Sequence, residues 1–155
     1  MIQRIQSIYL SVIALISLLL LKGNLIIFSD KTGQSIKVAF NGVFSNNAGQ
    51  GVVLIEKLIP LSGLIILIPI ISVATLLIFK YRKIQLRLSL FLIVLSTFLL
   101  IAFLHISLRL ISKFDASIVP GFKMILPLII LILSILTYRG IKKDDNLVKS
   151  YDRLR

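Results

Sequence analysis

Four long apolar blocks constrain the fold of this chain more than any other feature. Asp and Glu are absent from all four, and Lys or Arg residues lie at or near their ends. A bilayer core about 30 Å thick requires about 17–25 apolar residues for each helical span. The sequence therefore predicts an all-α integral membrane protein, a four-transmembrane-helix bundle formed by residues 1–138, with spans at 5–21, 58–79, 88–111 and 122–138.

The distribution of Lys and Arg predicts the orientation of these spans. Basic residues are dense in the short segment 80–87 and in the tail 139–155, and sparser in the long segment 22–57. Cytoplasmic segments of membrane proteins carry the excess of Lys and Arg. We therefore expect both termini in the cytoplasm. The first block lacks small residues at a cleavage position, so we expect it to be retained rather than removed as a signal peptide.

Charge and cysteine content exclude several function classes. The net charge is +12, but the basic residues flank apolar blocks, where they meet lipid headgroups. This pattern favours anionic lipids at the cytoplasmic face over nucleic acid as partners. The chain has no Cys and one His, which excludes disulfides, thiol catalysis, a structural zinc site and bis-histidine haem ligation. We expect no cofactor, no metal and no soluble substrate.

The outer loop 22–57 is too long for a simple connection, and its pattern predicts a small extracytoplasmic β-hairpin. Leu25–Phe28 is a short apolar run, and Ile36–Phe40 alternates apolar residues at period two, with a turn signal between them. The alternation places Ile36, Val38 and Phe40 on one face, over the helix ends. The following run, Val52–Ile55, is either a third strand or the start of the second helix.

His105 and Arg109 form the main polar pair inside a predicted span, one turn apart on one helix face. Such residues can mark an ion or substrate path. They also lie near the outer interface, where Arg109 can extend to the headgroups, and we expect a structural role. Ser62 with His105 gives a hydrolase alternative, although Pro60 replaces the first glycine of the G-x-S-G pattern. We expect no catalytic residues and no enzyme activity.

The tail 139–155 has the pattern of a short amphipathic cytoplasmic helix. Asp144 and Asp145 suit the start of a helix, where acidic groups meet the positive end of the helix dipole. Apolar residues then recur at helical spacing beside charged ones. We expect this face to bind a protein partner, and the alternatives are an anionic-lipid anchor or a solvated end. The partner-binding residues would be Leu147, Tyr151, Arg153 and Leu154.

The two ends of the chain resemble a known family. Residues 1–6 read M-I-Q-R-I-Q, and in residues 139–155 the run R-G-I-K-K-D is followed by L-V-K-S and D-R-L-R. These segments are similar to those of a family of small bacterial four-span membrane proteins of unknown function. The resemblance implies a bacterial inner-membrane protein whose cytoplasmic face makes the important contacts, and it carries over no catalytic or binding residues.

These observations favour one function and leave two alternatives. The favoured one is a non-catalytic accessory or scaffolding subunit of a larger inner-membrane complex, for secretion, insertion or respiratory assembly. A small independent transporter or channel is the alternative, although the chain lacks the internal repeat that many transporters have. An intramembrane hydrolase is the third.

Overall fold

The computed structural model describes residues 5–29, 35–47, 51–79, 81–114 and 117–153, with backbone alone at 46–47, 51 and 147–153. Helices form at the four long apolar blocks of the sequence. The elements are α1 (Ile5–Leu20), α2 (Ile59–Leu77), α3 (Arg82–Phe114), the short 3-10 helix η1 (Phe122–Met124) and α4 (Leu126–Arg153).

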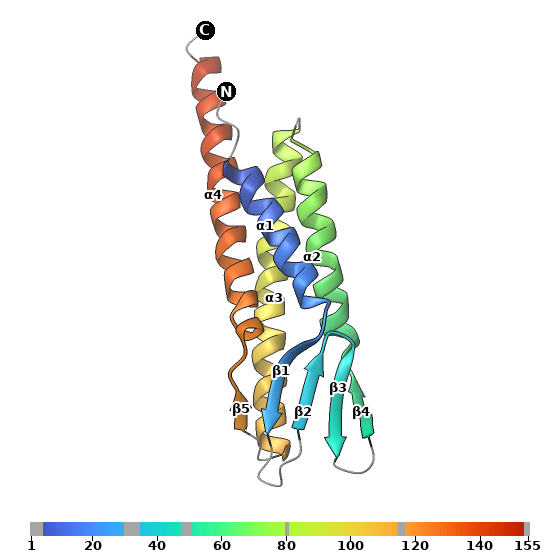
Figure 1. The fold of residues 1–155 in the computed structure, drawn as a ribbon. Helices are drawn as coiled ribbons and strands as arrows, with labels where there is room; N and C mark the ends of the chain where they lie inside the picture. The colour runs from blue at the N-terminus through green and yellow to red at the C-terminus, as the bar shows by residue number, and fades with distance from the viewer. Residues whose placement is uncertain (1–4, 30–34, 48–50, 80, 115–116, 154–155) are drawn as a thin grey trace.

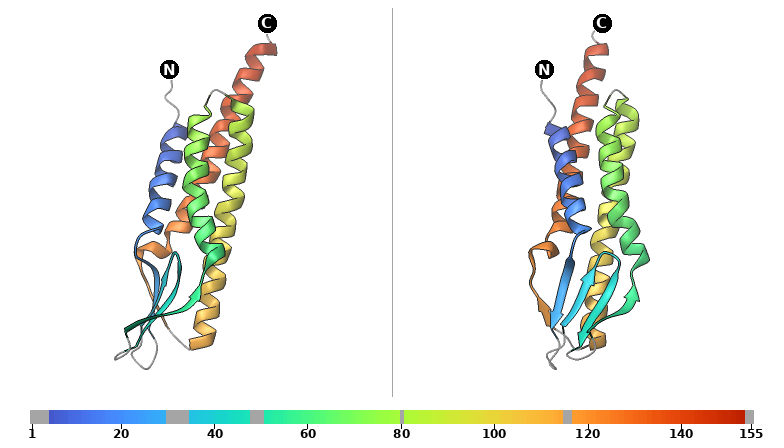
Figure 2. Two further views of the ribbon diagram at one scale, coloured as in Figure 1. Left: turned by 90° about the vertical axis from the view of Figure 1, so that its right-hand side faces the viewer. Right: turned by 45° about the vertical axis from the view of Figure 1, so that its right-hand side comes forward.

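The four helices pack side by side, with a sheet at one end of them (Figure 1). Helix α1 packs against α2 and α4, and α3 packs against the same two helices. Figure 2 shows the elongated shape that results. Within the described residues, three helical segments are long and apolar enough to cross a membrane, in α2, α3 and α4. Helix α1 is apolar but has only 16 residues.

Strands from residues 24–57 and 117–119 form an antiparallel sheet of five strands in the order β4-β3-β2-β1-β5. The first four strands follow one another along the chain, and the fifth comes from the connection between α3 and α4. The strands are β1 (Asn24–Ser29), β2 (Ser35–Ala39), β3 (Gly42–Asn47), β4 (Gly51–Lys57) and β5 (Ser117–Val119).

The pairing predicted for the outer hairpin is confirmed. Strands β1 and β2 are antiparallel, with Phe28 opposite Ile36 and Ile26 opposite Val38. All four of these side chains are at most 3% exposed, so the period-two alternation identified the buried face correctly. Strand β2 begins and ends one residue earlier than predicted, because Phe40 lies in the turn that leads to β3 and is half-buried.

The predicted fold class is wrong in two respects. The chain is not all-α with a small hairpin, because three further strands extend the hairpin into a five-stranded sheet. Nor do its described residues form four membrane-length helices, because three of their helical segments meet that length. Strand β3 has no apolar alternation, and β4 is an unbroken apolar run that periodicity does not assign to helix or strand.

One continuous core joins the helices to the sheet. Phe28 and Ile36 from the sheet belong to the same buried cluster as Phe103 and Leu110 from α3. Helix α3 has 33 residues and is about 50 Å long at 1.5 Å per residue, well beyond the bilayer core of about 30 Å. Its far end runs behind the sheet (Figure 1). The excess length of α3 therefore provides the surface on which the sheet rests.

The helix interior is rich in small hydroxyl side chains. Eight of them, from all four long helices, are at most 5% exposed: Ser17, Ser72, Thr75, Ser89, Ser96, Ser107, Ser134 and Thr137. Most donate to a carbonyl of their own helix, whereas Ser72 donates across to the carbonyl of Leu10 at 2.7 Å. Among the described residues, no buried side-chain nitrogen or oxygen lacks a partner. Small residues of this kind allow close helix contact in an apolar surrounding.

The predicted separate tail helix is instead the continuation of the last long apolar helix. Helix α4 runs without interruption from Leu126 to Arg153. Asp144 and Asp145 therefore lie inside a helix rather than at its start. The reason is that the stretch from Arg139 to Asn146 contains no proline, and a single Gly140 costs a helix only about 1 kcal/mol relative to alanine.

Candidate functional site

A β-bulge in β4 determines the geometry at the junction of sheet and helices. Ser45 pairs with Val53 and Val43 pairs with Glu56, so one extra residue stands on β4 between these pairs. Because side chains alternate along a strand, this extra residue puts Val53 and Glu56 on the same face. Val43 is buried on the helix-facing side, at 1% exposed. The bulge therefore turns Glu56 toward the helices.

Glu56 meets Arg109 of α3 across this junction. The Arg109 Nη1 donates to Glu56 Oε1 at 3.1 Å, and the side chains are 57% and 40% exposed. An ion pair this exposed contributes about 0–1 kcal/mol to stability. A guanidinium has five N–H donors, and the pair with Glu56 uses one nitrogen. Arg109 is thus positioned by Glu56 while retaining donors for a further anion.

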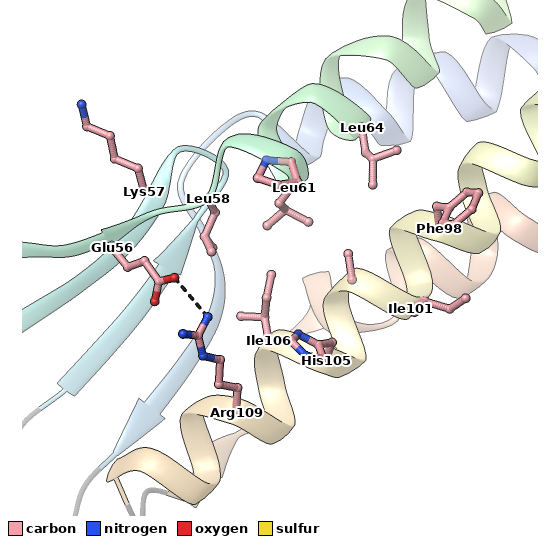
Figure 3. Close-up of a pocket in the computed structure, with 12 residues that line it drawn as sticks. Glu56, Lys57, Leu58, Leu61, Leu64, Phe98, Ile101, His105, Ile106 and Arg109 are labelled. Atoms are coloured by element: carbon pink, nitrogen blue, oxygen red, sulfur yellow. Dashed lines mark hydrogen bonds and ion pairs between the residues drawn. The ribbon is translucent and has the colours of Figure 1, made fainter.

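A cavity of about 710 Å³ opens beside this ion pair, between the end of β4, the first turns of α2 and the C-terminal part of α3 (Figure 3). Glu56, His105 and Arg109 supply its polar groups, and Lys57 lines it with its ammonium pointing away. The rest of its lining is apolar: Leu58, Pro60, Leu61, Leu64, Phe98, Ile101, Ala102 and Ile106. Its volume lies in the range of about 300–1,000 Å³ that is usual for ligand pockets.

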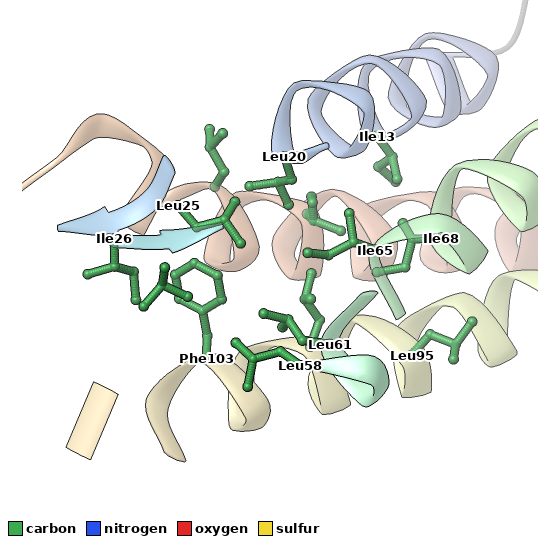
Figure 4. Packing of buried hydrophobic residues seen from close by; sticks show 14 of the residues in the cluster. Ile13, Leu20, Leu25, Ile26, Leu58, Leu61, Ile65, Ile68, Leu95 and Phe103 are labelled. Atoms are coloured by element: carbon green, nitrogen blue, oxygen red, sulfur yellow. The ribbon is translucent and has the colours of Figure 1, made fainter. Parts of the chain in front are cut away.

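The cavity has one fixed wall and one open side. Leu58 and Leu61 belong to both the cavity lining and the buried core, where they pack near Phe103 (Figure 4). On α3, by contrast, Phe98 and Ile101 are 57% and 54% exposed. The cavity is therefore a groove with a rigid floor that opens to the surroundings of the helices.

His105 and Arg109 both lie along this groove, as their one-turn spacing predicts, but Ser62 is not among the lining residues. The Ser62 hydroxyl has one proton, and its oxygen lies 2.7 Å from the carbonyl of Phe40 and 2.9 Å from that of Leu58. It ties the start of α2 to the turn between β2 and β3. The structure therefore gives Ser62 a positioning contact and does not join it to His105.

Strand β4 forms an exposed edge of the sheet. Its neighbour on one side is β3, and within the described residues no strand pairs with its other side. Four consecutive large apolar side chains on it are between 38% and 66% exposed: Val52, Val53, Leu54 and Ile55. At the opposite edge, β5 covers β1 over only three residues. Apolar, unpaired edge strands are uncommon on isolated proteins because they pair with other chains.

A second polar cluster, the terminal junction, joins the two ends of the chain at the opposite end of the helices. It consists of Gln6, Arg82, Gly140 and Asp144. Gln6 Nε2 donates to Asp144 Oδ2 at 2.8 Å, and Arg82 Nη1 donates to the carbonyl of Asp144 at 3.3 Å. Gln6 is only 7% exposed, and a Cβ on Gly140 would lie 2.8 Å from its Cγ. Gly140 therefore makes the space that Gln6 occupies.

The tail residues predicted to bind a partner lie on the last turns of α4. The backbone of Leu147, Tyr151 and Arg153 is helical. Their side chains, and Leu154 altogether, fall outside the described part of the chain. Their role as a partner-binding face stays a prediction.

The terminal junction brings together the two sequence segments that carry the family resemblance. A family model described as Domain of unknown function (DUF4293) matches residues 2–154. The chain belongs to this family. Comparison with curated proteins and with solved structures gives no match. The resemblance to a family of unknown function is confirmed, and the description of the DUF4293 family names no activity.

Several residues of these sites in the DUF4293 chain carry little sequence signal. Gln6 and Gly140 look like ordinary residues at the ends of apolar blocks, although both lie in the segments that carry the family resemblance. For Glu56, the one signal in the sequence is its position as the acidic residue next to the second apolar block. Its contact with Arg109 depends on a bulge, and a bulge cannot be read from apolar periodicity. Among the described residues, no group of His, Cys, Asp and Glu is arranged to hold a metal ion.

Proposed function

We propose that this chain is a non-catalytic accessory subunit of a larger assembly in the cytoplasmic membrane of a bacterium. Secretion, protein insertion and respiratory assembly are the kinds of complex in which such subunits occur. The observation that carries the proposal is the exposed apolar edge strand β4. An isolated protein rarely leaves such an edge uncovered, and a subunit uses it to pair with its neighbour.

The large apolar side chains on the outside of the helices support the membrane placement. The outer surfaces of α2 and α3 carry large apolar residues, while the interior holds Ser and Thr hydroxyls, an arrangement typical of helices in lipid. The exposed residues include Ile66, Ile70, Val73, Leu77, Phe91, Val94, Phe98, Ile101 and Leu104. A soluble protein would place these apolar side chains inside.

We assign the terminal junction to the cytoplasmic side and the sheet to the outer side. The first turn of α1 and the last turns of α4 lie at the same end of the helices, opposite the sheet (Figure 1). Arg82, Lys83, Lys142 and Lys143 gather at that end. With α2, α3 and α4 crossing the membrane and both chain ends on one side, α1 crosses as well. Its 16 residues give about 24 Å of helix, which modest thinning of the bilayer accommodates.

A second copy of the chain does not fit the edge of β4. Antiparallel pairing of two identical strands requires a two-fold axis perpendicular to them. The strands run roughly along the helices (Figure 1), so that axis would lie in the membrane plane. The two copies would then be inserted in opposite orientations. The occupant that fits is an extended segment of a different protein, with apolar side chains for both faces of β4.

Hydrogen exchange on the purified complex tests this pairing directly. If an extended segment adds to β4, the backbone amides of residues 52–56 that face away from β3 become protected in the complex and exchange freely in the isolated chain. Exchange at β2, which is central in the sheet, should be the same in both. Unchanged exchange along β4 in the presence of every co-purifying protein would contradict the proposal.

Two matched substitutions identify the edge. Val52→Lys places a charge on β4, and Val119→Lys places the same charge on β5 at the opposite edge of the sheet. Both valines are exposed, at 66% and 43%, so neither change should unfold the protein. We expect Val52→Lys to release the partner and Val119→Lys to keep it. Equal retention of the partner by both variants would show that β4 is not the docking edge.

A further inference from the structure

We propose that the groove between α2 and α3 binds one phospholipid of the outer leaflet, with its phosphate at Arg109 and an acyl chain along the apolar wall. The inference rests on the membrane placement proposed above, but not on the role of β4 in docking. It commits to a lipid because both the charge and the depth of the groove match one.

The polar end of the groove is complementary to a phosphate diester. Arg109 is the cation that faces the groove, whereas the Lys57 ammonium points away from it (Figure 3). Glu56 holds the guanidinium through Nη1 at 3.1 Å and leaves other N–H donors for phosphate oxygens. Arginine binds phosphate through the planar set of N–H donors on its guanidinium.

The apolar part of the groove has the depth of one leaflet. On α3, Phe98 and Arg109 are three helical turns apart, which is about 16 Å at 1.5 Å per residue. Half of a bilayer core about 30 Å thick is about 15 Å. A lipid whose phosphate lies at Arg109 therefore has its acyl chain beside Phe98 near the bilayer midplane. His105, one turn below Arg109, lies at the level of the glycerol ester groups.

The groove opens in the direction from which a lipid would arrive. Phe98 and Ile101 are more than half exposed, while Leu58 and Leu61 on the opposite wall are at most 8% exposed. The floor is thus fixed by the core, and the open side faces the acyl chains of the surrounding bilayer. Binding involves no covalent step. One lipid leaves the layer that surrounds the helices and is retained in the groove.

Retention of lipid by the purified full chain provides the test. The protein is reconstituted into nanodiscs of phosphatidylethanolamine and phosphatidylglycerol, released into mild detergent and analysed by native mass spectrometry. We expect one phospholipid to stay bound. Arg109→Gln should lower the retained fraction about three- to tenfold, the size expected for a partly exposed charge-assisted hydrogen bond. Lys113→Gln, which removes a neighbouring charge outside the groove, should have no effect.

The Glu56→Gln variant distinguishes two roles of Arg109, phosphate binding and a purely structural ion pair. If Arg109 serves only to pair with Glu56, the two neutral variants Glu56→Gln and Arg109→Gln behave alike. If Arg109 binds phosphate, Glu56→Gln removes the competing carboxylate, and lipid retention stays the same or rises. Parallel losses in both variants would overturn the phosphate assignment.

Filling the groove tests the acyl-chain part with the charges intact. Ala102 lines the groove, so Ala102→Phe should displace the lipid, whereas Leu104→Phe on the exposed face of the same helix should not. Retention of the lipid by Ala102→Phe would overturn the proposal. If the chain fails to enter nanodiscs at all, the membrane placement is wrong together with the groove. If it enters them and holds no lipid, the groove proposal alone is wrong.

Discussion

Replacing Gly140 by alanine tests whether the two ends of the chain are packed together in the terminal junction. In an exposed helix this change stabilises by about 1 kcal/mol, because glycine loses more backbone entropy than alanine. At Gly140 the new Cβ would lie 2.8 Å from Cγ, 3.3 Å from Nε2 and 3.4 Å from Cδ of Gln6. Forcing a buried side chain to move costs about 1–3 kcal/mol. We therefore expect a net loss of about 0–2 kcal/mol in the free energy of unfolding.

The same change in a Gln6→Ala background should reverse its sign. Gln6→Ala removes all three close atoms together with the 2.8 Å hydrogen bond to Asp144, at a cost of about 0.5–1.5 kcal/mol. Gly140→Ala then no longer meets its three nearest atoms and should stabilise by about 1 kcal/mol. The coupling energy between the two positions is accordingly about 1–3 kcal/mol, which a double-mutant cycle measures.

Unfolding by sodium dodecyl sulfate in detergent micelles, followed by circular dichroism, gives the four free energies. Gly63 in α2 supplies a matched control, since a Cβ there meets nothing within 4 Å. Gly63→Ala should stabilise the wild type and the Gln6→Ala variant equally. The reasoning is refuted if Gly140→Ala stabilises the wild type as much as Gly63→Ala does, because Gln6 would then not be packed against α4.

Three further predictions concern topology, the tail and the helix interior. Alkaline phosphatase fused after Gln50 should be active and a fusion after Lys83 inactive, and the reverse result would invert the assignment of sides. Deletion of residues 146–155 should leave the chain inserted but reduce co-purification with its partner, and unchanged co-purification would reduce the tail to a charged anchor. Ser72→Ala should lower the free energy of unfolding by about 0.5–1.5 kcal/mol through loss of the hydrogen bond to Leu10, measured in the same micelle titration.

Local patterns in the sequence determined the helices and one pair of strands. The apolar blocks have the length and continuity of membrane helices, and a helix satisfies its backbone groups within its own segment. The hairpin of β1 and β2 was equally visible, because alternation at period two marks each strand and a turn signal lies between them. In each case the information lies within about 20 neighbouring residues.

Only the tertiary structure decided how these pieces meet. Strand β5 has three residues and pairs with β1 far upstream, so no local period marks it, and β4 is left as the open edge. Glu56 reaches Arg109, 53 residues away, because a bulge turns it toward α3. Gln6 and Asp144 are 138 residues apart and meet because α1 packs against α4. Contacts of this kind depend on helix packing and strand order, which periodicity within a segment does not encode.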